Sequence, residues 1–263
     1  MDNRRRAAQV SHDPHREADV RRDRLTRREM IIAGAAGVAA VAGRSGGALS
    51  RLAAQGQLPA CVVRPEQTEG PYFVDERLNR ADLRLDPTDG TVKDGMPLRV
   101  RMVVSHVDDS GCAPLPGATV DLWQCDALGV YSDVRDFQGL FDTRGKKFLR
   151  GHQVTDRNGA AEFLTIYPGW YAGRTPHIHF KIRVPAGPGG RAYAFTSQLY
   201  FDEAVTDQVY TLPPYNTKGP RTTRNPQDRI FAAGGSGPQL ILPVTQDAGG
   251  AAYAGTFDIG LRL

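Results

Sequence analysis

The stretch Phe148-Leu-Arg-Gly-His-Gln-Val-Thr-Asp-Arg-Asn-Gly-Ala-Ala-Glu-Phe-Leu-Thr-Ile166 holds two strand-like runs around a short turn. The runs are Phe148–Thr155 and Ala161–Ile166, and the turn Asp156–Gly159 between them ends in Asn-Gly. An Asn-Gly pair between two such runs favours a tight reversal of the chain, because both residues tolerate positive φ angles. The stretch therefore predicts a β-hairpin.

Strand-like patterns continue on both sides of this stretch. In Leu98–Val104 apolar residues alternate with mostly polar ones, which is typical of a strand with one buried face. Further strand-like runs are Ala118–Cys125, His177–Val184, Ala192–Phe201, Leu240–Val244 and Ala252–Leu263. Residues 132–148 and 202–237 are polar or rich in Pro, Gly and Thr, and predict long loops with one helical turn at Pro226–Phe231. Short strands with almost no helical period predict an all-β fold, a single-domain β-sandwich with long irregular loops and little helix.

The first sixty residues have the composition of a targeting segment. Thr26-Arg-Arg-Glu-Met-Ile-Ile32 resembles the twin-arginine export motif, and the apolar run Met30–Ala42 is shorter than the roughly 20 residues that span a bilayer. Ala40-Val-Ala42 offers a cleavage site, and residues 43–60 are typical of a linker. We therefore expect a twin-arginine signal peptide and linker over 1–60, one domain over 61–263, and export by the twin-arginine translocation machinery to the periplasm, the cell surface or the medium. The alternative is an uncleaved anchor or a basic tail.

The charge distribution argues against a nucleic-acid partner. The first sixty residues hold 11 of the 33 Lys and Arg residues but only 6 of the 29 Asp and Glu residues, so the excess of positive charge lies there. Residues 61–263 carry a formal charge of −1. A nearly neutral domain has no excess of basic residues from which to build a patch that binds phosphate backbones.

Three cysteines, Cys61, Cys112 and Cys125, follow the predicted leader. An oxidising compartment would permit one disulfide among them and leave one thiol over. The sequence leaves all three pairings open. No Cys-x-x-Cys spacing indicates a zinc or redox site.

The stretch Thr165-Ile-Tyr-Pro-Gly-Trp-Tyr-Ala-Gly-Arg-Thr-Pro-His-Ile-His-Phe180 gathers side chains that can bind a metal. On a strand, His177 and His179 would point to the same face, about 6.5–7 Å apart at Cα, so one metal could take both imidazoles. Such a pair is also common as a structural or surface feature. No Asp or Glu follows the pair at short range, although metal sites with two histidines normally add a carboxylate. The nearby candidates are tyrosines, whose phenolates are hard donors suited to ferric iron.

Further motifs extend from this stretch in both directions. They are Thr68-Glu-Gly-Pro-Tyr72, Trp123-Gln-Cys-Asp-Ala-Leu-Gly-Val-Tyr131, Phe148–Asp156, Phe163–Ile166, Pro168-Gly-Trp-Tyr171, Arg174, His177-Ile-His179 and Ser197-Gln-Leu-Tyr-Phe201. In this order they resemble the motifs of the intradiol ring-cleavage dioxygenases of the protocatechuate and catechol dioxygenase type. The resemblance covers residues 61–263. Within that family, the chain is most similar to an exported, single-domain branch.

The resemblance implies one non-haem Fe(III) per chain, held by Tyr131, Tyr171, His177 and His179. Arg174 is implied to stabilise negative charge on the substrate ring, and Tyr171 to accept a proton from the substrate. Gln198 is implied to be catalytic, and Gln198, Arg174 and Tyr72 to line the substrate pocket. The implied reaction cleaves a catechol between its two hydroxyl-bearing carbons with O2 and yields a cis,cis-muconate-type diacid.

Alternatives stand beside this interpretation. Tyr167 competes with Tyr171 for the place of second tyrosine ligand, because both lie beside the same Pro-Gly turn. The Pro-Gly-x-Tyr spacing favours Tyr171, with Tyr167 as a packing residue at the end of a strand. Gly117–Val120 and Thr155–Gly159 also resemble segments of transthyretin-like β-sandwich domains, which would make the chain a non-catalytic binding module. A metal enzyme of the same fold with different chemistry is a third interpretation. Both a monomer and a homo-oligomer agree with the sequence, and the particular catechol stays open.

Overall fold

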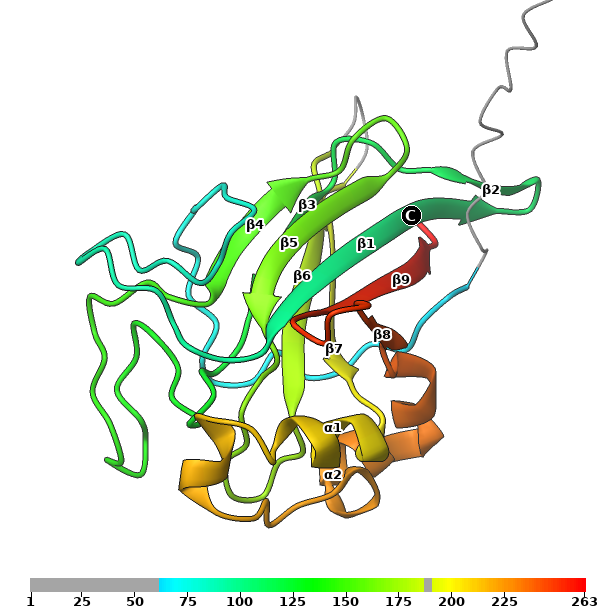
Figure 1. Ribbon diagram of the computed structural model, residues 1–263. Helices are drawn as coiled ribbons and strands as arrows, with labels where there is room; N and C mark the ends of the chain where they lie inside the picture. The colour runs from blue at the N-terminus through cyan, green and yellow to red at the C-terminus, as the bar shows by residue number, and fades with distance from the viewer. Residues whose placement is uncertain (1–61, 187–190) are drawn as a thin grey trace, which may run out of the picture. The chain divides into compact units, whose positions relative to one another are not determined.

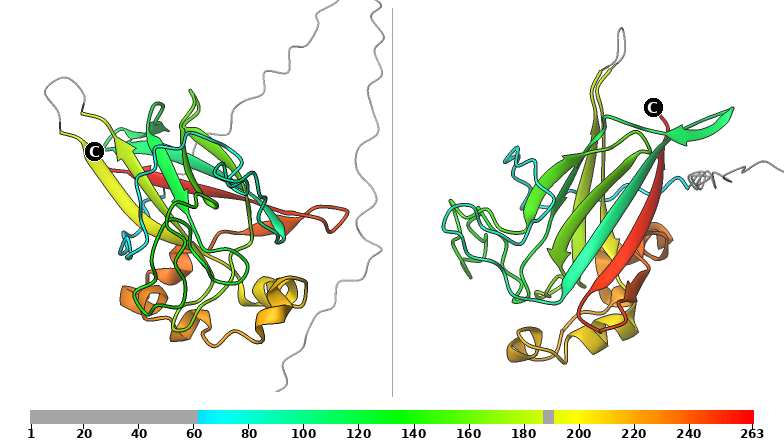
Figure 2. Two further views of the ribbon diagram at one scale, coloured as in Figure 1. Left: turned by 90° about the vertical axis from the view of Figure 1, so that its left-hand side faces the viewer. Right: turned by 45° about the horizontal axis from the view of Figure 1, so that its top comes forward.

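The computed structural model describes residues 62–186 and 191–263. The predicted signal peptide and linker, and Cys61, lie outside the described residues. In the described part, nine strands form two sheets that pack face to face, which confirms the predicted all-β sandwich with little helix (Figures 1 and 2). None of the helices in these two ranges is long and apolar enough to cross a membrane.

Both sheets are built around a long interior strand. The first sheet contains β1 (Pro97–Asp108), β2 (Gly111–Pro114), β5 (Ala160–Ile166), β8 (Val244–Gln246) and β9 (Tyr253–Leu261). The second contains β3 (Thr119–Trp123), β4 (Arg150–Val154), β6 (His177–Val184) and β7 (Tyr193–Tyr200). In the first sheet β1 pairs antiparallel with β2 and β5 and parallel with β9, while β8 extends the sheet beyond β9. In the second sheet the order is β4-β3-β6-β7, and every pair is antiparallel.

The main hydrophobic core lies between the two sheets. Alternate residues of β1, such as Leu98 and Val100, are almost fully buried in it, as the alternating pattern predicts. Ile178, Phe180 and Ile182 of β6 fill the same core from the second sheet. Because side chains alternate along a strand, the remaining residues of β6 point to the opposite face of that sheet.

The predicted hairpin is wrong in its pairing. The turn forms, since the Gly159 N–H donates to the Asp156 carbonyl at 2.9 Å, but β4 pairs with β3 and β5 pairs with β1. The Thr155 N–H bonds to the Ala118 carbonyl, whereas the Val104 N–H bonds to the Gly159 carbonyl. The turn therefore carries the chain from one sheet to the other. Turn residues specify a reversal, but the partner of each strand is chosen by packing elsewhere.

Short helices gather at one end of the sandwich (Figure 1). The sequence does not predict α1 (Glu203–Val209), which begins at an Asp202 cap inside a segment rich in Pro and Thr. α2 (Arg229–Ala232) overlaps the predicted helical turn. Four 3-10 turns accompany them, at Tyr215–Lys218, Asn225–Gln227, Ala233–Gly235 and Gly237–Leu240. The predicted strand Leu240–Val244 is wrong, because β8 begins only at Val244, and β2 is also absent from the prediction.

The described cysteines differ in state. Cys112 is disulfide-bonded, and Cys125 is a buried free thiol. The two pairings that use Cys125 are therefore excluded. Burial raises the pKa of the Cys125 thiol to about 12, so this side chain stays protonated and unreactive at neutral pH.

Substitution of Gly159 tests the crossing between the sheets. Its φ is +72°, and a Cβ there would lie 2.2 Å from the Val104 carbonyl oxygen, so the backbone must shift. Gly117 is a matched control, because its φ is +81° but a Cβ would meet nothing within 4 Å. We expect Gly117→Ala to lower the free energy of unfolding by about 1–2 kcal/mol and Gly159→Ala by about 3 kcal/mol or more, measured by chemical denaturation. Equal losses would contradict the steric argument.

Candidate functional site

The two histidines of β6 lie on the outer face of the second sheet. The apolar residues of β6 fill the core, so His177 and His179 point away from it, and both are buried by the loops that cover this face. The strand register places His179 between Trp123 of β3 and Gln198 of β7. The Trp123 indole stacks on the His179 imidazole, with ring centroids 5.0 Å apart. Three neighbouring strands therefore fix the position of the pair.

A second, smaller cluster of aromatic side chains covers this outer face. It consists of Tyr72, Trp123, Cys125 and Tyr131, with Phe73, Val134, Phe141 and Tyr171 packed against it. Trp123 is the last residue of β3, and the others come from the segment before β1 and from the loops after β3 and β5. Gly70 allows the first segment to approach, because its φ is +74° and a Cβ there would lie 3.2 Å from Cε1 of His179. The site is thus closed by segments far apart in the sequence.

Four polar groups converge on Nε2 of His177. The phenol oxygens of Tyr131 and Tyr171 lie 3.4 Å and 3.3 Å from this atom. A guanidinium nitrogen of Arg174 lies 3.2 Å away, and Nε2 of His179 lies 3.0 Å away. The structure therefore brings the four predicted ligands and the predicted arginine together within a few ångströms.

The second nitrogen of His177 determines which lone pair faces this cluster. Nδ1 lies 2.6 Å from the Thr175 carbonyl oxygen, which can only accept a hydrogen bond. Nδ1 therefore carries the proton, and the lone pair of Nε2 faces the cluster. The Nδ1 atom of His179 has no hydrogen-bond partner among the described residues.

Burial keeps all four predicted ligands uncharged. It raises the pKa of Tyr171 to about 12 and the pKa of Tyr131 well above its ordinary value. It also lowers the pKa values of His177 and His179 well below the ordinary value of histidine, with a further contribution from the positive charge of Arg174. Neutral imidazoles are ready to bind a metal, whereas the phenols need a nearby cation to lose their protons.

The donor set fits a highly charged metal ion. A single lone pair on His177 cannot satisfy the several groups that crowd around it, whereas a cation could accept electron pairs from both imidazoles and both phenolates. Among the described residues, no group of three or more His, Cys, Asp or Glu side chains is arranged to hold a metal ion. A metal held by His177 and His179 would therefore need the tyrosine oxygens. Two nitrogen and two anionic oxygen donors suit iron better than the soft metals that thiolates select.

Lys218 joins the two loops that carry the tyrosines. Its ammonium group donates to the carbonyl of Leu128, in the turn before Tyr131, and at 2.6 Å to the carbonyl of Trp170, next to Tyr171. Sequence reasoning did not select Lys218, because a lysine in a Pro-rich loop is usually a solvated side chain. The fold alone brings it to both carbonyls.

Arg174 is held by two further side chains. Its Nε donates to Asp228 Oδ2 at 2.9 Å, and its terminal nitrogen donates to Gln198 Oε1. Asp228 is completely buried, accepts the Thr175 N–H at 2.9 Å and caps α2 through its other oxygen. Sequence reasoning missed Asp228. An Asp before a short helical turn predicts an N-cap, but no local sequence pattern predicts its ion pair with an arginine fifty-four residues earlier.

Tyr72 and Tyr167 have different surroundings. The Tyr72 ring lies 4.7 Å from the Tyr131 ring, and its hydroxyl donates to Asp136. Both Tyr72 and Tyr131 line a cavity of about 180 Å³ together with Tyr171. Tyr167 is turned away, and its hydroxyl bonds to Thr206 at 2.7 Å. The structure therefore places Tyr171, and not its rival Tyr167, beside the histidines.

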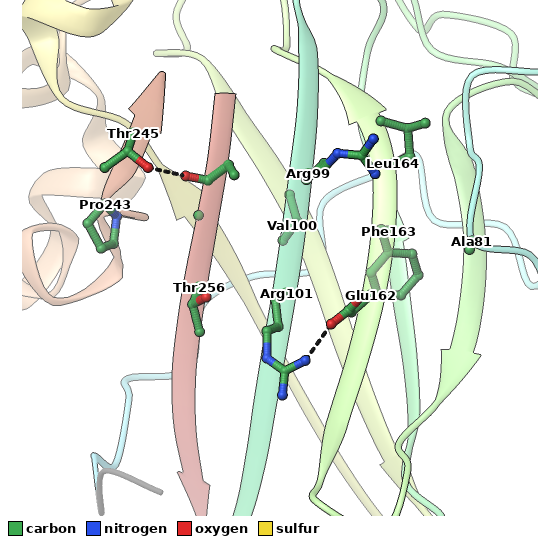
Figure 3. Close-up of a pocket in the computed structure, with 12 residues that line it drawn as sticks. Ala81, Arg99, Val100, Arg101, Glu162, Phe163, Leu164, Pro243, Thr245 and Thr256 are labelled. Atoms are coloured by element: carbon green, nitrogen blue, oxygen red, sulfur yellow. Dashed lines mark hydrogen bonds and ion pairs between the residues drawn. The ribbon is translucent and has the colours of Figure 1, made fainter. Parts of the chain in front are cut away.

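A larger cavity lies on the first sheet, away from these residues. Its volume is about 640 Å³, and Figure 3 shows that β1, β5 and β9 supply much of its lining. An ion pair between Arg101 and Glu162 crosses it. None of the predicted ligands, nor Arg174, is among its lining residues. The smaller cavity is the better candidate despite its size, because it is lined by Tyr131 and Tyr171, two of the predicted ligands.

Known proteins share the sequence and the fold of this chain. The Dioxygenase family profile matches residues 68–213. The beta chain of protocatechuate 3,4-dioxygenase from Burkholderia cepacia is 38% identical over 187 residues, which are 67% of this chain and 71% of that relative. Catechol 1,2-dioxygenase from Candida albicans is 28% identical over 167 residues, which are 54% of this chain and 50% of that relative's length. An intradiol ring-cleavage dioxygenase from Tetranychus urticae superposes with a TM-score of 0.63 at 32% identity, covering 77% of this chain and 94% of that one.

The matched segment and the site coincide. Residues 68–213 contain the four predicted ligands and also Tyr72, Arg174 and Gln198, whereas Lys218 and Asp228 lie beyond it. The comparisons do not favour the interpretation of the chain as a transthyretin-like binding module. The chain belongs to the intradiol ring-cleavage dioxygenase family.

Proposed function

We propose that the chain is a non-haem Fe(III) dioxygenase that opens catecholic rings between the two hydroxyl-bearing carbons. One catechol and one O2 give one cis,cis-muconate-type diacid, so both oxygen atoms enter the product and no further reductant is needed. Family membership supports the class of reaction. The observation that carries the proposal is the convergence of two phenol oxygens and a second imidazole on Nε2 of His177.

The ligand set supports the proposed cofactor. One Fe(III) per chain would be held by Tyr131, Tyr171, His177 and His179. When bound, ferric iron would make a deprotonated catechol ring reactive toward O2. The burial that keeps these side chains neutral also excludes water, which strengthens every electrostatic interaction at the site.

Tyr171 is suited to take a proton from the substrate. It is only partly buried and lines the 180 Å³ cavity, so an entering catechol hydroxyl can approach its phenol oxygen. Burial raises the pKa of Tyr171 to about 12, so the phenolate form in which it would hold a metal has a high affinity for a proton at neutral pH. A catechol that loses a proton to Tyr171 becomes an anion inside the site.

Arg174 is suited to stabilise negative charge that develops on the ring and its oxygens. It is the cation nearest to the histidine pair, with a guanidinium nitrogen 3.2 Å from Nε2 of His177. A preorganised positive charge in a water-excluded site stabilises a transition state more than the same charge does in water. Gln198 and Asp228 hold the guanidinium in place, so we assign both as positioning residues for Arg174.

We propose further that the chain is exported through the twin-arginine route. The basic and then apolar leader supports this, and the disulfide at Cys112 supports an oxidising destination. A catechol met outside the cytoplasm would then be the substrate.

The cofactor proposal is tested by the colour of the protein. Purified protein should contain one iron per chain and be red-brown from charge transfer between tyrosinate and iron. Anaerobic addition of catechol should shift the spectrum, and O2 should then open the ring. Tyr131→Phe should abolish or shift the colour, whereas Tyr167→Phe, a buried tyrosine bonded to Thr206, should leave it unchanged. Colourless protein that stays inactive after iron reconstitution would contradict the proposal.

The role of Asp228 is tested by its replacement with asparagine. Asn can still cap α2 but cannot hold the guanidinium as an anion, so Arg174 should lose its fixed position. We expect kcat to fall about 10- to 100-fold, with little change in KM or iron content. Asp202→Asn is the matched control, because it makes the same change at the exposed cap of α1. Equal activity of both variants would show that Asp228 has only a structural role.

The export proposal is tested by cell fractionation. Arg27→Lys with Arg28→Lys should retain the protein inside the cell, because the predicted motif requires both arginines. Arg21→Lys with Arg22→Lys makes the same change at an adjacent pair outside the motif and should be exported normally. Export of the Arg27, Arg28 variant at the normal level would overturn the proposed route.

A further inference from the structure

The cavity beside the two tyrosines has an apolar wall that leads to the surface. Tyr131, which is completely buried, and Tyr171 line it, and Val130, Leu140 and Phe141 are among its other lining residues. Leu140 is 76% exposed although it lines the cavity. A ring that meets the tyrosines through its hydroxyl groups would therefore direct its opposite edge along apolar side chains toward solvent.

The mouth of the cavity is also apolar. Leu128 lines it and is 43% exposed. Phe137 is 74% exposed and stacks on Tyr72, which lines the cavity, with ring centroids 6.3 Å apart. Two large apolar lining residues, Leu128 and Leu140, and Phe137 on the lining residue Tyr72 are thus exposed to water. Exposed apolar groups that gather at a binding site are covered when an apolar ligand is bound.

The charged groups of the cavity already have partners. Asp136 accepts the Tyr72 hydroxyl through one oxygen and the backbone N–H groups of Gln138 and Leu140 through the other. These hydrogen bonds, led by that from Tyr72, lower the pKa of Asp136, so it stays an anion. Lys218 is the one cation among the described lining residues, and it donates to two backbone carbonyls.

An anionic substituent would be disfavoured in this setting. It would meet the fixed negative charge of Asp136, and Lys218 has little donor capacity left for it, because its ammonium group donates to the Leu128 and Trp170 carbonyls and lies over the Trp170 ring. It would also leave the apolar wall without a partner. An uncharged apolar substituent is not repelled by Asp136 and needs no cation as a partner. It would also cover Leu140 and Phe137.

We propose that the cavity selects catechols whose ring edge opposite the hydroxyls carries an uncharged apolar substituent, such as an alkyl or aryl group, over catechols that carry a carboxylate there. The proposal rests on the proposed dioxygenase function and adds the substrate class. Leu140 and Phe137 are the residues that would contact the substituent, and Asp136 is the residue that would repel a carboxylate.

The test compares three substrates with the iron-loaded protein: catechol, 4-tert-butylcatechol and 3,4-dihydroxybenzoate. We expect kcat/KM for 4-tert-butylcatechol to exceed that for 3,4-dihydroxybenzoate by about tenfold or more. Dissociation constants from anaerobic spectral titration should follow the same order, which separates binding from turnover.

Two variants locate the selectivity in the apolar wall. Leu140→Lys should reduce the preference about tenfold or reverse it, because it removes an apolar contact and adds a cation at the opening. Phe137→Ala should weaken the binding of 4-tert-butylcatechol more than it weakens the binding of catechol. Leu263→Lys is the matched control, since Leu263 is exposed and is not among the lining residues of the cavity.

The outcomes separate this inference from the proposed function. Ring opening of catechol with equal or better use of 3,4-dihydroxybenzoate would overturn the substrate class and leave the dioxygenase proposal intact. An unchanged preference in Leu140→Lys would also overturn it. Failure to open any of the three catechols after iron loading would overturn the proposed function itself.

Discussion

The burial of β6 on both of its faces is the constraint on which the site depends. One face packs Ile178 and Phe180 into the core between the sheets, and the other presents His177 and His179 to the covering loops. A slip of one residue in the register would exchange the two faces, placing imidazoles in the core and apolar side chains at the site. Stability and chemistry therefore require the same strand register.

The burial of this site also determines which of its side chains carry a charge. Burial favours the neutral forms of Tyr131, Tyr171 and both histidines, so the charge directly beside His177 is that of the ion pair between Arg174 and Asp228. Removing one partner of a buried ion pair leaves an uncompensated charge and typically costs about 3–5 kcal/mol. The ion pair with Asp228 therefore holds the Arg174 guanidinium in place without leaving an unpaired charge in the buried site. A trivalent cation would reverse the preference of the phenols for their protonated forms.

The covering loops are irregular but firmly tied to the sandwich. Lys218 links the Leu128 and Trp170 carbonyls, and Gly70 lets the segment before β1 lie against His179. Functional residues often lie on loops that a rigid scaffold positions. In this chain, a few contacts hold the covering loops against the sandwich. The apolar opening at Leu140 and Phe137 is the exception, since these side chains remain exposed.

The sequence alone determined the fold class and the strand character of most segments, and it predicted the types and the order of the candidate ligands, because periodicity and motif spacing are local properties. It also favoured Tyr171 over Tyr167 through the Pro-Gly-x-Tyr spacing. Only the tertiary structure decided that β4 and β5 belong to different sheets, since a turn sequence does not choose strand partners. Likewise, it alone brought Asp228 to Arg174 and Lys218 to the two loop carbonyls, because contacts between residues distant in sequence follow from packing and leave no local pattern.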